Sequence, residues 1–388
     1  MPLPEPMGDT GLIFNLSTPD TLSVAMKSEL RMAFVIDSLP SLGGGEKVLF
    51  TALEAYPHAE VFTLVYNKDV FRDTPIANRK VKTSYLDTLP LAHEHHRLLL
   101  PFMPSAIERF NLQNYDHIVC FSYAVAHGVK NYNGARHVSY TYTPMRYAWM
   151  DLNINGTRTP KNRLIDRLMQ NFRKWDQKAA SRVHQFAAIS QAVSQRIRRA
   201  YQRDAPVIYP PVEVDRFRPN HHRENYFVTI ARLVPHKRID LLIQAFNQLN
   251  LPLLIIGNGP ELPRLKNLAS SNIKFLGYES DEKVSELLGK ARGFVCAAEE
   301  DFGIAIVEAQ AAGCPVITYG QGGALETVTD GVTGVLFPEQ SILCIMDAVE
   351  RFERAESSFH TGELVKNASR FSKVRFLREF LEFVQPNH

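Results

Sequence analysis

The sequence predicts an α/β protein made of two Rossmann-like, doubly wound domains with parallel sheets, which face each other across a cleft. At 388 residues the chain is too long for one ordinary core. Short β-branched runs alternate with longer amphipathic stretches, as in parallel sheets covered by helices on both faces. This alternation is interrupted by a proline-rich stretch and then starts again, which predicts a second domain.

In the first half, four short β-branched or aromatic runs predict strands, and two longer stretches predict helices. The predicted strands are Met32–Ile36, Glu60–Val65, His117–Phe121 and Val138–Thr143, and the predicted helices are Glu46–Ala55 and Lys161–Ser181. Residues 1–29 precede the first strand and are expected to be a flexible extension. Residues 30–205 are therefore predicted to form the first domain.

The same pattern returns in the second half. The predicted strands are Tyr226–Ile230, Leu253–Ile256, Lys274–Leu276, Gly293–Ala297 and Val316–Thr318, and the predicted helices are Ile239–Gln248, Asp281–Leu288 and Ile304–Ala312. Paired prolines in a polar stretch place the linker near residues 203–225, and the second domain is predicted over 206–371. A last helix over 372–388, capped by Ser372, has Val374, Leu377, Leu381 and Val384 at helical spacing. It either covers the second domain or crosses back to the first.

Composition excludes several classes of protein. The hydrophobic fraction of 45% and the charged fraction of 22% are those of an ordinary soluble globular protein, and a net charge of +3 gives no reason to expect nucleic-acid binding. No stretch is long and apolar enough to cross a bilayer, and the N-terminus does not resemble a signal peptide. The four cysteines are far apart with apolar neighbours, so we expect buried free thiols and a cytoplasmic location. They are Cys120, Cys296, Cys314 and Cys344.

The most specific motif is Glu299-Glu300-Asp301-Phe302-Gly303-Ile304, which follows a predicted strand and opens a helix that contains Glu308. Glu300 lies in the turn and Glu308 about one turn inside the helix, so both can face one ligand at the helix start. Free backbone N–H groups point to the same place. Carboxylates accept hydrogen bonds from sugar hydroxyls and N–H groups donate to a diphosphate, so this turn suits a nucleotide sugar.

These residues resemble glycosyltransferase family 4, whose members have the GT-B fold and a Glu-x7-Glu signature, matched here by Glu300 and Glu308. The sequence of this turn is most similar to that of the O-antigen and exopolysaccharide mannosyltransferase branch. The resemblance implies that Glu300 and the N–H groups of Phe302, Gly303 and Ile304 hold the donor sugar. It also implies that Glu308 accepts hydrogen bonds from the ribose.

A second motif, Ala231-Arg232-Leu233-Val234-Pro235-His236-Lys237-Arg238, follows the first strand of the second half and resembles the family's Gly-Arg-Leu…Lys-Gly segment. Arg232 and Lys237 would clamp the donor diphosphate, because a guanidinium suits bidentate phosphate contact and an ammonium supplies a compact charge. With Glu300 they are the predicted catalytic residues. Two cations in a closed cleft make a metal unnecessary, so no metal or other cofactor is expected.

Glycines mark two further parts of the predicted donor site. Gly44 and Gly45, in a three-glycine turn after the first strand, let the backbone approach a phosphate or sugar closely. This turn lacks the spacing of a dinucleotide-binding loop, and alone a plain turn is equally consistent with it. Gly277 and Tyr278 resemble a segment that shapes the nucleoside pocket.

The segment from Tyr140 to Trp149 resembles a first-domain phrase of the mannosyltransferase branch. Tyr142 stands where that branch has histidine, and tyrosine cannot act as an imidazolium near neutral pH. Tyr142 and Arg146 are predicted to lie on the acceptor side. Trp149 is either a further acceptor contact or, more simply, a packing residue.

Local charge suggests how the acceptor is presented. Eight cations face two aspartates between Arg158 and Val183, and a histidine cluster at 93–96 precedes the apolar run Leu98–Pro104. The simpler interpretation is a solvated helix face and a buried element. The alternative is a patch that docks on anionic lipid at the inner face of the cell membrane.

Together these features predict a retaining, metal-independent hexosyltransferase. It would move mannose from GDP-mannose onto a lipid-linked oligosaccharide in surface polysaccharide synthesis. A non-catalytic nucleotide-sugar-binding subunit, suggested by Tyr142, and a nucleotide-sugar epimerase are the alternatives. Fold resemblance alone does not assign substrates.

Overall fold

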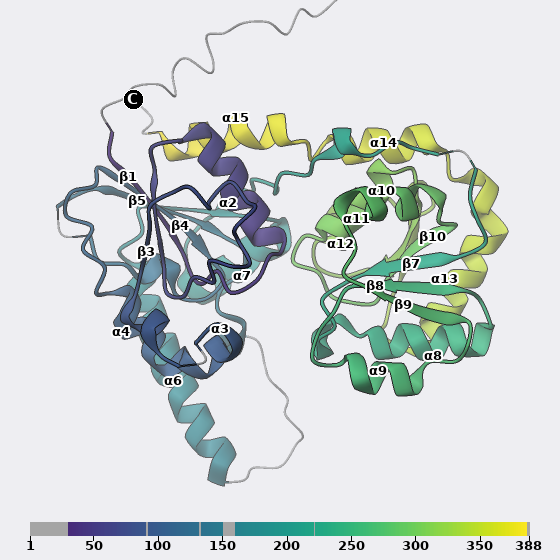
Figure 1. Ribbon diagram of the computed structural model, residues 1–388, viewed down its shortest axis with the longest axis horizontal. Coiled ribbons are helices and arrows are strands. Elements are labelled where there is room, and N and C mark those ends of the chain that lie inside the picture. Colours follow the sequence, from purple (N-terminus) through teal and green to yellow (C-terminus); the bar gives the residue numbers. More distant parts are fainter. Residues whose placement is uncertain (1–29, 91, 132, 150–159, 221, 386–388) are drawn as a thin grey trace, which may run out of the picture.

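The computed structural model describes residues 30–90, 92–131, 133–149, 160–220 and 222–385. Two six-stranded sheets, each with parallel pairing between its neighbouring strands, form two α/β domains that lie side by side (Figure 1). This confirms the predicted fold class. The predicted extension over residues 1–29 lies outside the described residues.

The first domain has the strand order β3-β2-β1-β4-β5-β6. Its strands are β1 (Met32–Ile36), β2 (Glu60–Thr63), β3 (Val81–Thr83), β4 (His117–Ser122), β5 (Arg136–Thr141) and β6 (Gln185–Ala188). Its α-helices are α2 (Gly44–Ala55), α3 (Ala92–His95), α4 (Met103–Ile107), α5 (Arg146–Trp149), α6 (Pro160–Ala180) and α7 (Gln191–Tyr201). Short 3-10 helices include η3 (His96–Phe102) and η4 (Ala126–Gly128).

The second domain has the order β12-β11-β10-β7-β8-β9, which repeats the topology of the first. Its strands are β7 (Phe227–Ile230), β8 (Leu253–Ile256), β9 (Ile273–Gly277), β10 (Gly293–Cys296), β11 (Val316–Tyr319) and β12 (Gly334–Phe337). Its α-helices are α8 (Ile239–Leu249), α9 (Leu262–Leu268), α10 (Asp281–Lys290), α11 (Ile304–Ala311), α12 (Ala324–Thr327), α13 (Ile342–Ala355) and α14 (Thr361–Ser369). The 3-10 helix η5 (Val214–Arg216) lies in the connection between the domains.

Both sheets reverse their strand order at one place, between β1 and β4 in the first domain and between β7 and β10 in the second. A crevice opens at the carboxyl ends of the strands at such a point, and open α/β sheets bind ligands there. The glycine turn follows β1, the Arg232–Lys237 segment follows β7, and the Glu300 turn follows β10. Three of the sequence motifs therefore lie at the two switch points.

The last helix, α15 (Lys373–Val384), crosses from the second domain to the first, where it runs beside α2 (Figure 1). The predicted Ser372 cap is confirmed, since the Ser372 hydroxyl accepts from the Arg375 N–H. The predicted apolar stripe is confirmed at Val384 and wrong at Val374: Val374 is exposed, and Val384 shares the buried face with Phe376, Phe380 and Phe383. The aromatic rings decide the face because they fill the space over β4 and β5, where Phe380 stacks on Phe121.

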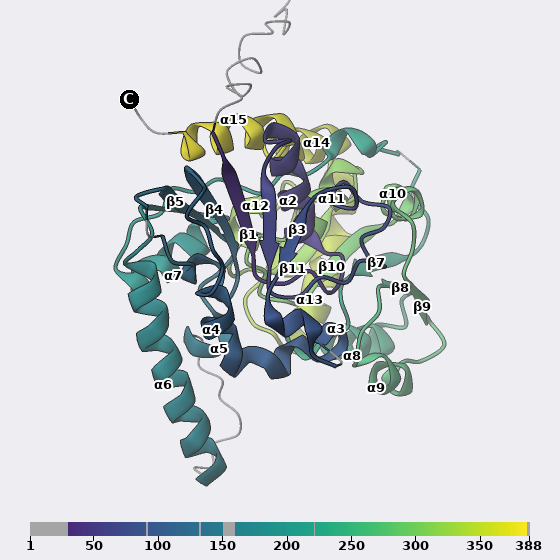
Figure 2. The same ribbon diagram turned by 60° about the vertical axis from the view of Figure 1, so that its left-hand side comes forward.

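Buried side chains of both sheets and of α15 form the core, and three of the four cysteines are buried free thiols as predicted. Cys344 is only partly buried, because the inward face of α13 is formed by Ile345, Ala348, Val349 and Phe352. Helix α6 extends away from the body of the first domain in both views (Figures 1 and 2). No described helix is both long and apolar enough to span a bilayer.

Candidate functional site

The turn after β10 holds Glu300 against Lys237. The Lys237 ammonium lies 2.6 Å from one Glu300 carboxylate oxygen and 2.8 Å from the other. Burial opposes the charged form of Lys237, but the adjacent Glu300 carboxylate outweighs it and raises the pKa of the ammonium. The structure thus brings together two predicted catalytic residues from the two loops of one switch point.

Helix α11 begins directly after this turn, at Ile304, with Gly303 as its N-cap. Gly303 has φ +91°, a left-handed conformation that favours glycine, and a Cβ there would press on Ile306. The Phe302 side chain is buried against Tyr209 and Phe371. Phe302 therefore anchors the turn through its ring and can face a ligand at the helix start only through its backbone.

Glu308, inside α11, is buried between cations of other elements. Its carboxylate lies 2.8 Å from the Arg216 guanidinium and 3.7 Å from the Lys47 ammonium. Burial raises the pKa of Glu308, and the two cations partly offset this effect. Because Arg216 and Lys47 lie in η5 and α2, Glu308 is held from outside its own helix. Neither cation was among the site residues predicted from the sequence.

The glycine turn of the first domain contacts both domains. A Cβ at Gly44 would lie 2.7 Å from the Ile304 side chain, so this turn touches the start of α11. Tyr142 packs against Gly45 and donates its hydroxyl to the Gly45 carbonyl at 2.7 Å. Burial raises the pKa of Tyr142 well above its usual value, so the hydroxyl stays protonated and can donate. Tyr142 thus holds the glycine turn in place through its ring and its hydroxyl.

Glu46, the next residue, bends back onto the start of α2. Its carboxylate interacts with the backbone N–H groups of Gly43 and Glu46, an arrangement like the glutamate of a capping box. Burial raises the pKa of Glu46 to about 7, while these N–H groups and the charge of Arg232 act in the opposite direction. Arg232 is exposed just after β7, and its charge acts on this carboxylate from the second domain.

The remaining predicted donor residues lie at the end of β9. Gly277 has φ +78° and accepts from the Gly257 N–H at 2.6 Å, and Tyr278 is 81% exposed. Gly257 in turn packs on the Ala231 backbone, where a Cβ would have no room. These contacts link the Gly277 turn to the strand end that carries Arg232.

Asp301 joins the two domains. It lies 2.5 Å from the Arg146 guanidinium and also pairs with Arg196, while Arg196 reaches Glu299 at 2.7 Å. Glu300 therefore faces Lys237 in its own domain, whereas its neighbours Glu299 and Asp301 face arginines of the first domain and share Arg196. Arg196 did not stand out in the sequence.

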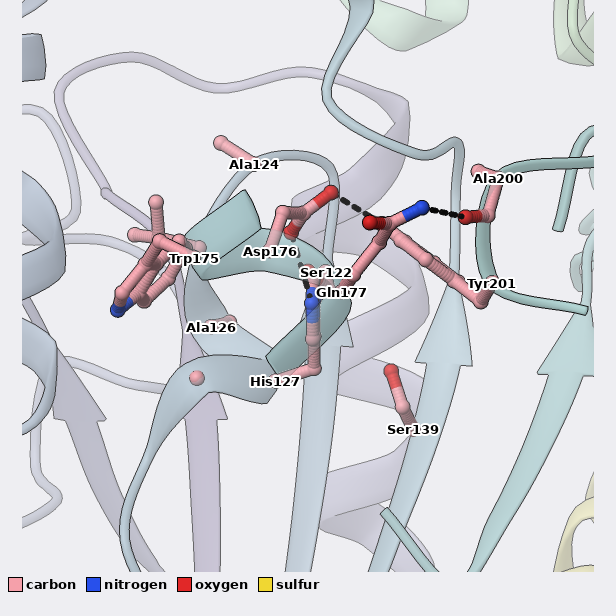
Figure 3. A network of polar contacts seen from close by, with 12 residues as sticks. Ser122, Ala124, Ala126, His127, Ser139, Trp175, Asp176, Gln177, Ala200 and Tyr201 are labelled. Atoms are coloured by element: carbon pink, nitrogen blue, oxygen red, sulfur yellow. Dashed lines mark hydrogen bonds and ion pairs between the residues drawn. The ribbon is translucent and has the colours of Figure 1, made fainter. Parts of the chain in front are cut away.

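A buried polar network anchors the segment that carries Arg146 (Figure 3). Asp176 pairs with His127 at 3.0 Å, and it accepts from the Tyr201 hydroxyl at 2.8 Å and the Trp149 indole at 2.6 Å. His127 also lies 3.0 Å from the Ser122 hydroxyl. A serine, a histidine and an aspartate in this order resemble a hydrolytic triad. All three are buried, so the network joins α5, α6 and α7 and has no access to a substrate.

A hollow outside the cleft lies at the amino ends of β1, β2 and β3. It is lined by Arg31, Glu60, Lys80, Lys82, Arg109 and Tyr115, among others. Because ligands of open α/β sheets bind at the carboxyl ends, this hollow is separate from the candidate site. Within the described residues, no group of three or more His, Cys, Asp or Glu side chains is arranged to hold a metal ion.

Residues 212–371 match the family of group 1 glycosyl transferases. The match covers the second domain, including Arg232, Lys237, Glu300 and Glu308.

Two groups of relatives match part of the chain. A GDP-mannose-dependent alpha-(1-6)-phosphatidylinositol monomannoside mannosyltransferase of Mycobacterium tuberculosis is 32% identical over an alignment of 170 residues, and the match covers 36% of this chain and 44% of the relative. A D-inositol 3-phosphate glycosyltransferase of Mycobacterium bovis is 29% identical over 172 residues, 38% of this chain and 36% of the relative. The chain thus matches less than half the length of these relatives.

Solved structures match nearly the whole chain. HepE of Anabaena in complex with UDP-glucose has a TM-score of 0.67 at 19% identity and covers 91% of this chain and 98% of its own. Sucrose-phosphate synthase of Thermosynechococcus elongatus has a TM-score of 0.72 at 17% identity, and the match covers 91% of this chain and 98% of that protein. These likenesses confirm the predicted GT-B fold.

Proposed function

We propose that this protein is a nucleotide-sugar-dependent glycosyltransferase with its donor site between the two switch points. The observation that carries the proposal is the convergence of the glycine turn, the start of α11 and the Lys237–Glu300 pair on one place. The contact between Gly44 and Ile304 joins the glycine turn to the start of α11. The hydrogen bonds between Lys237 and Glu300 hold the turn that precedes this helix. Family similarity of residues 212–371 supports the same activity.

In this proposal the donor diphosphate lies against the start of α11, with Arg232 and Lys237 as its cations. Cleavage of the bond between the sugar's anomeric carbon and the phosphate oxygen leaves extra negative charge on the diphosphate. One cation about 4 Å away contributes roughly 4 kcal/mol at an effective dielectric near 20. Preorganised charge of this kind lowers the barrier without a metal ion.

Glu300 and Glu308 would bind hydroxyl groups of the sugar and the ribose. Lys237 already holds Glu300 in place, and Arg216 and Lys47 hold Glu308. The acceptor hydroxyl would attack the anomeric carbon on the face from which the diphosphate leaves, and its proton would pass to the departing phosphate oxygen. The anomeric configuration is then retained, and Tyr142 and Arg146 lie on the first-domain side where the acceptor enters.

We further propose mannose from GDP-mannose as the transferred sugar and a lipid-linked oligosaccharide of surface polysaccharide synthesis as the acceptor. The turn's similarity to the mannosyltransferase branch and the GDP-mannose-dependent relatives support this choice. HepE was solved with UDP-glucose, so the test includes uridine donors. We propose titration calorimetry with GDP-mannose, UDP-glucose, UDP-N-acetylglucosamine and ADP-glucose.

The expected result is binding of one donor, lost in Arg232→Ala and kept in Arg354→Ala. Arg354 is a suitable control because it lies exposed on α13, far along the chain from the candidate site. Absence of binding by all four donors would contradict the proposal.

A membrane-facing surface would present the acceptor. Leu98 and Phe102 of η3 are 75% and 56% exposed, and α4, which contacts η3, lies beside the base of α6 in both views (Figures 1 and 2). The described part of α6 carries exposed Arg167, Lys174 and Lys178. Arg158 lies outside the described residues. Exposed apolar side chains beside cations suit an anionic lipid surface.

Co-sedimentation with vesicles tests this surface. We expect binding to phosphatidylglycerol vesicles and not to phosphatidylcholine vesicles, with a loss in Leu98→Ser/Phe102→Ser. Val374→Ser, at an equally exposed apolar position on α15, should leave binding unchanged. Equal binding by both variants would overturn the assignment.

The second candidate is a nucleotide-sugar-binding subunit without activity, which Tyr142 favours because the related branch has histidine there. This candidate predicts donor binding and no transfer to any acceptor. Detection of transferred sugar with any acceptor excludes it.

A further inference from the structure

Helix α7 begins against the second domain, although it belongs to the first. Ser190 caps it by accepting from the Val193 N–H at 3.1 Å. The first two N–H groups of the helix, those of Gln191 and Ala192, donate to the Glu326 carboxylate at 2.8 and 3.2 Å. A carboxylate at a helix N-terminus satisfies donors that otherwise lack partners and interacts favourably with the helix dipole. Here the carboxylate comes from α12 of the other domain.

One turn further along α7, Arg196 binds a second loop of that domain. Its guanidinium pairs with Asp301 and reaches Glu299 at 2.7 Å. The Arg196 and Asp301 side chains are 18% and 16% exposed, so the pair is shielded from solvent far more than an ordinary surface pair. Helix α7 therefore contacts both the Glu300 turn and α12, which begins directly after the loop at Gly322 and Gly323.

These two loops of the second domain form one unit. The Gly323 N–H donates to the Glu300 carbonyl at 2.8 Å, and a Cβ at Gly323 would lie 2.3 Å from the Phe302 Cα. The loops cannot separate without breaking this contact. Whatever holds Glu326 and Asp301 therefore also holds the backbone of Glu300.

The other end of α7 is fixed in the first domain. The Tyr201 hydroxyl donates to Asp176 of α6, and the Gln177 amide donates to the Ala200 carbonyl at 3.2 Å (Figure 3). The helix is thus anchored at its C-terminus in one domain and bound at its N-terminus to the other.

We propose that α7 is a positioning helix that fixes the donor turn of the second domain against the first, with Arg196 and the Glu326-capped N-terminus as its interdomain contacts. This inference rests on the proposed function for its catalytic consequence, but the contact itself does not. Arg196 and Glu326 act through the Glu300 turn and touch no substrate. Their loss lets the turn shift relative to the glycine turn and the acceptor side.

Amide hydrogen exchange of the whole chain tests the contact directly. In Arg196→Gln and Glu326→Gln we expect the amides of Gln191 and Ala192 to exchange about tenfold faster or more, as for loss of a charge-assisted hydrogen bond. Arg198→Gln is the matched control, because Arg198 lies on the same helix and is 78% exposed. Unchanged exchange in both Arg196→Gln and Glu326→Gln would overturn the proposal.

Steady-state kinetics test the consequence. We expect kcat for transfer to fall about tenfold or more in Arg196→Gln, with partial recovery in Arg196→Lys and no change in Arg198→Gln. Wild-type kcat and KM in Arg196→Gln, despite faster exchange, would show that α7 does not position the site and would leave the proposed function intact. A wild-type protein that transfers no sugar would contradict the proposed function, while the exchange result would still decide the contact.

Discussion

The Lys237 ammonium lies within 2.8 Å of both carboxylate oxygens of Glu300, and the two residues come from loops that follow neighbouring strands β7 and β10. The ammonium donates to both carboxylate oxygens, so each charged group is neutralised by the other. A diphosphate that binds beside Lys237 would also pair with the ammonium. Glu300 would then accept a hydrogen bond from a sugar hydroxyl. The pair is thus arranged in advance for a ligand that carries both groups.

Removal of the ammonium is expected to reduce transfer strongly. In Lys237→Ala, Glu300 loses its partner and the leaving diphosphate loses a cation, so we predict a fall in kcat of about 10²–10³-fold. Quantification of the released nucleoside diphosphate measures this change. Lys366→Ala, at an exposed position on α14, is the control and should retain wild-type kcat. A loss of less than about threefold in Lys237→Ala would contradict the role of Lys237.

Tyr142 is expected to matter through its hydroxyl. Tyr142→Phe keeps the ring against Gly45 but leaves the Gly45 carbonyl without its donor. We predict a loss of about 1 kcal/mol in the free energy of unfolding, measured by urea denaturation, and a higher KM for the donor. If stability and KM both equal those of the wild type, the hydroxyl does not support the glycine turn.

The contact between Gly44 and Ile304 predicts that a substitution at Gly44 weakens donor binding and that a second substitution at Ile304 restores it. In Gly44→Ala the new methyl group would lie 2.7 Å from Ile304 Cδ1, which pushes the two domains apart at the donor site. We expect a several-fold higher KM for the donor. Ile304→Val removes this carbon, so the double variant should recover most of the loss. Failure of the double variant to recover would show that the clash with Ile304 is not the cause of the loss.

Stability is expected to depend on pH through Glu46. Its pKa is about 7 in the folded protein against 4.5 for an ordinary glutamate, so between these values the folded chain binds more protons than the unfolded chain. The contribution of Glu46 to stability is therefore complete below pH 4.5 and is lost as the pH rises through 7. The groups that face it are Arg232, Tyr123 and Tyr142.

Thermal midpoints measured at pH 5, 6, 7 and 8 test this dependence. We expect the decline between pH 5 and pH 7 to be shallower in Glu46→Gln than in the wild type. Glu382→Gln, at an exposed position on α15, should follow the wild-type curve. Identical slopes for wild type and Glu46→Gln would show that Glu46 titrates as an ordinary carboxyl.

Local signals in the sequence were enough to predict the fold class and the turns of the candidate site. The Glu300 turn could be found because a strand, a glycine and a helix start follow each other within ten residues, and all of them are local. Strands β3, β6 and β12 were not predicted, because they have only three or four residues and show no clear period.

The partners of the site residues could not be read in the same way. Arg196 lies 105 positions from Asp301, and Gln191 lies 135 positions from Glu326, so both contacts depend on how the two domains meet. The inward face of α15 was predicted correctly at Val384 and wrongly at Val374, since Val374 and Phe376 can each begin a stripe at helical spacing that ends at Val384. The packing of Phe376 and Phe380 on Tyr140 decides which of these two faces of α15 points inward.

The most direct test of the central claim is transfer of radiolabelled sugar from a nucleotide donor into a lipid extract of the cells that produce this protein. With GDP-[14C]mannose we predict label in the lipid fraction and release of GDP in equal amounts. Both should be lost in Lys237→Ala and retained in Lys366→Ala. Binding of a donor without any transfer of label, from this or the other three donors, would contradict the account and favour a subunit that binds nucleotide sugars without catalysis.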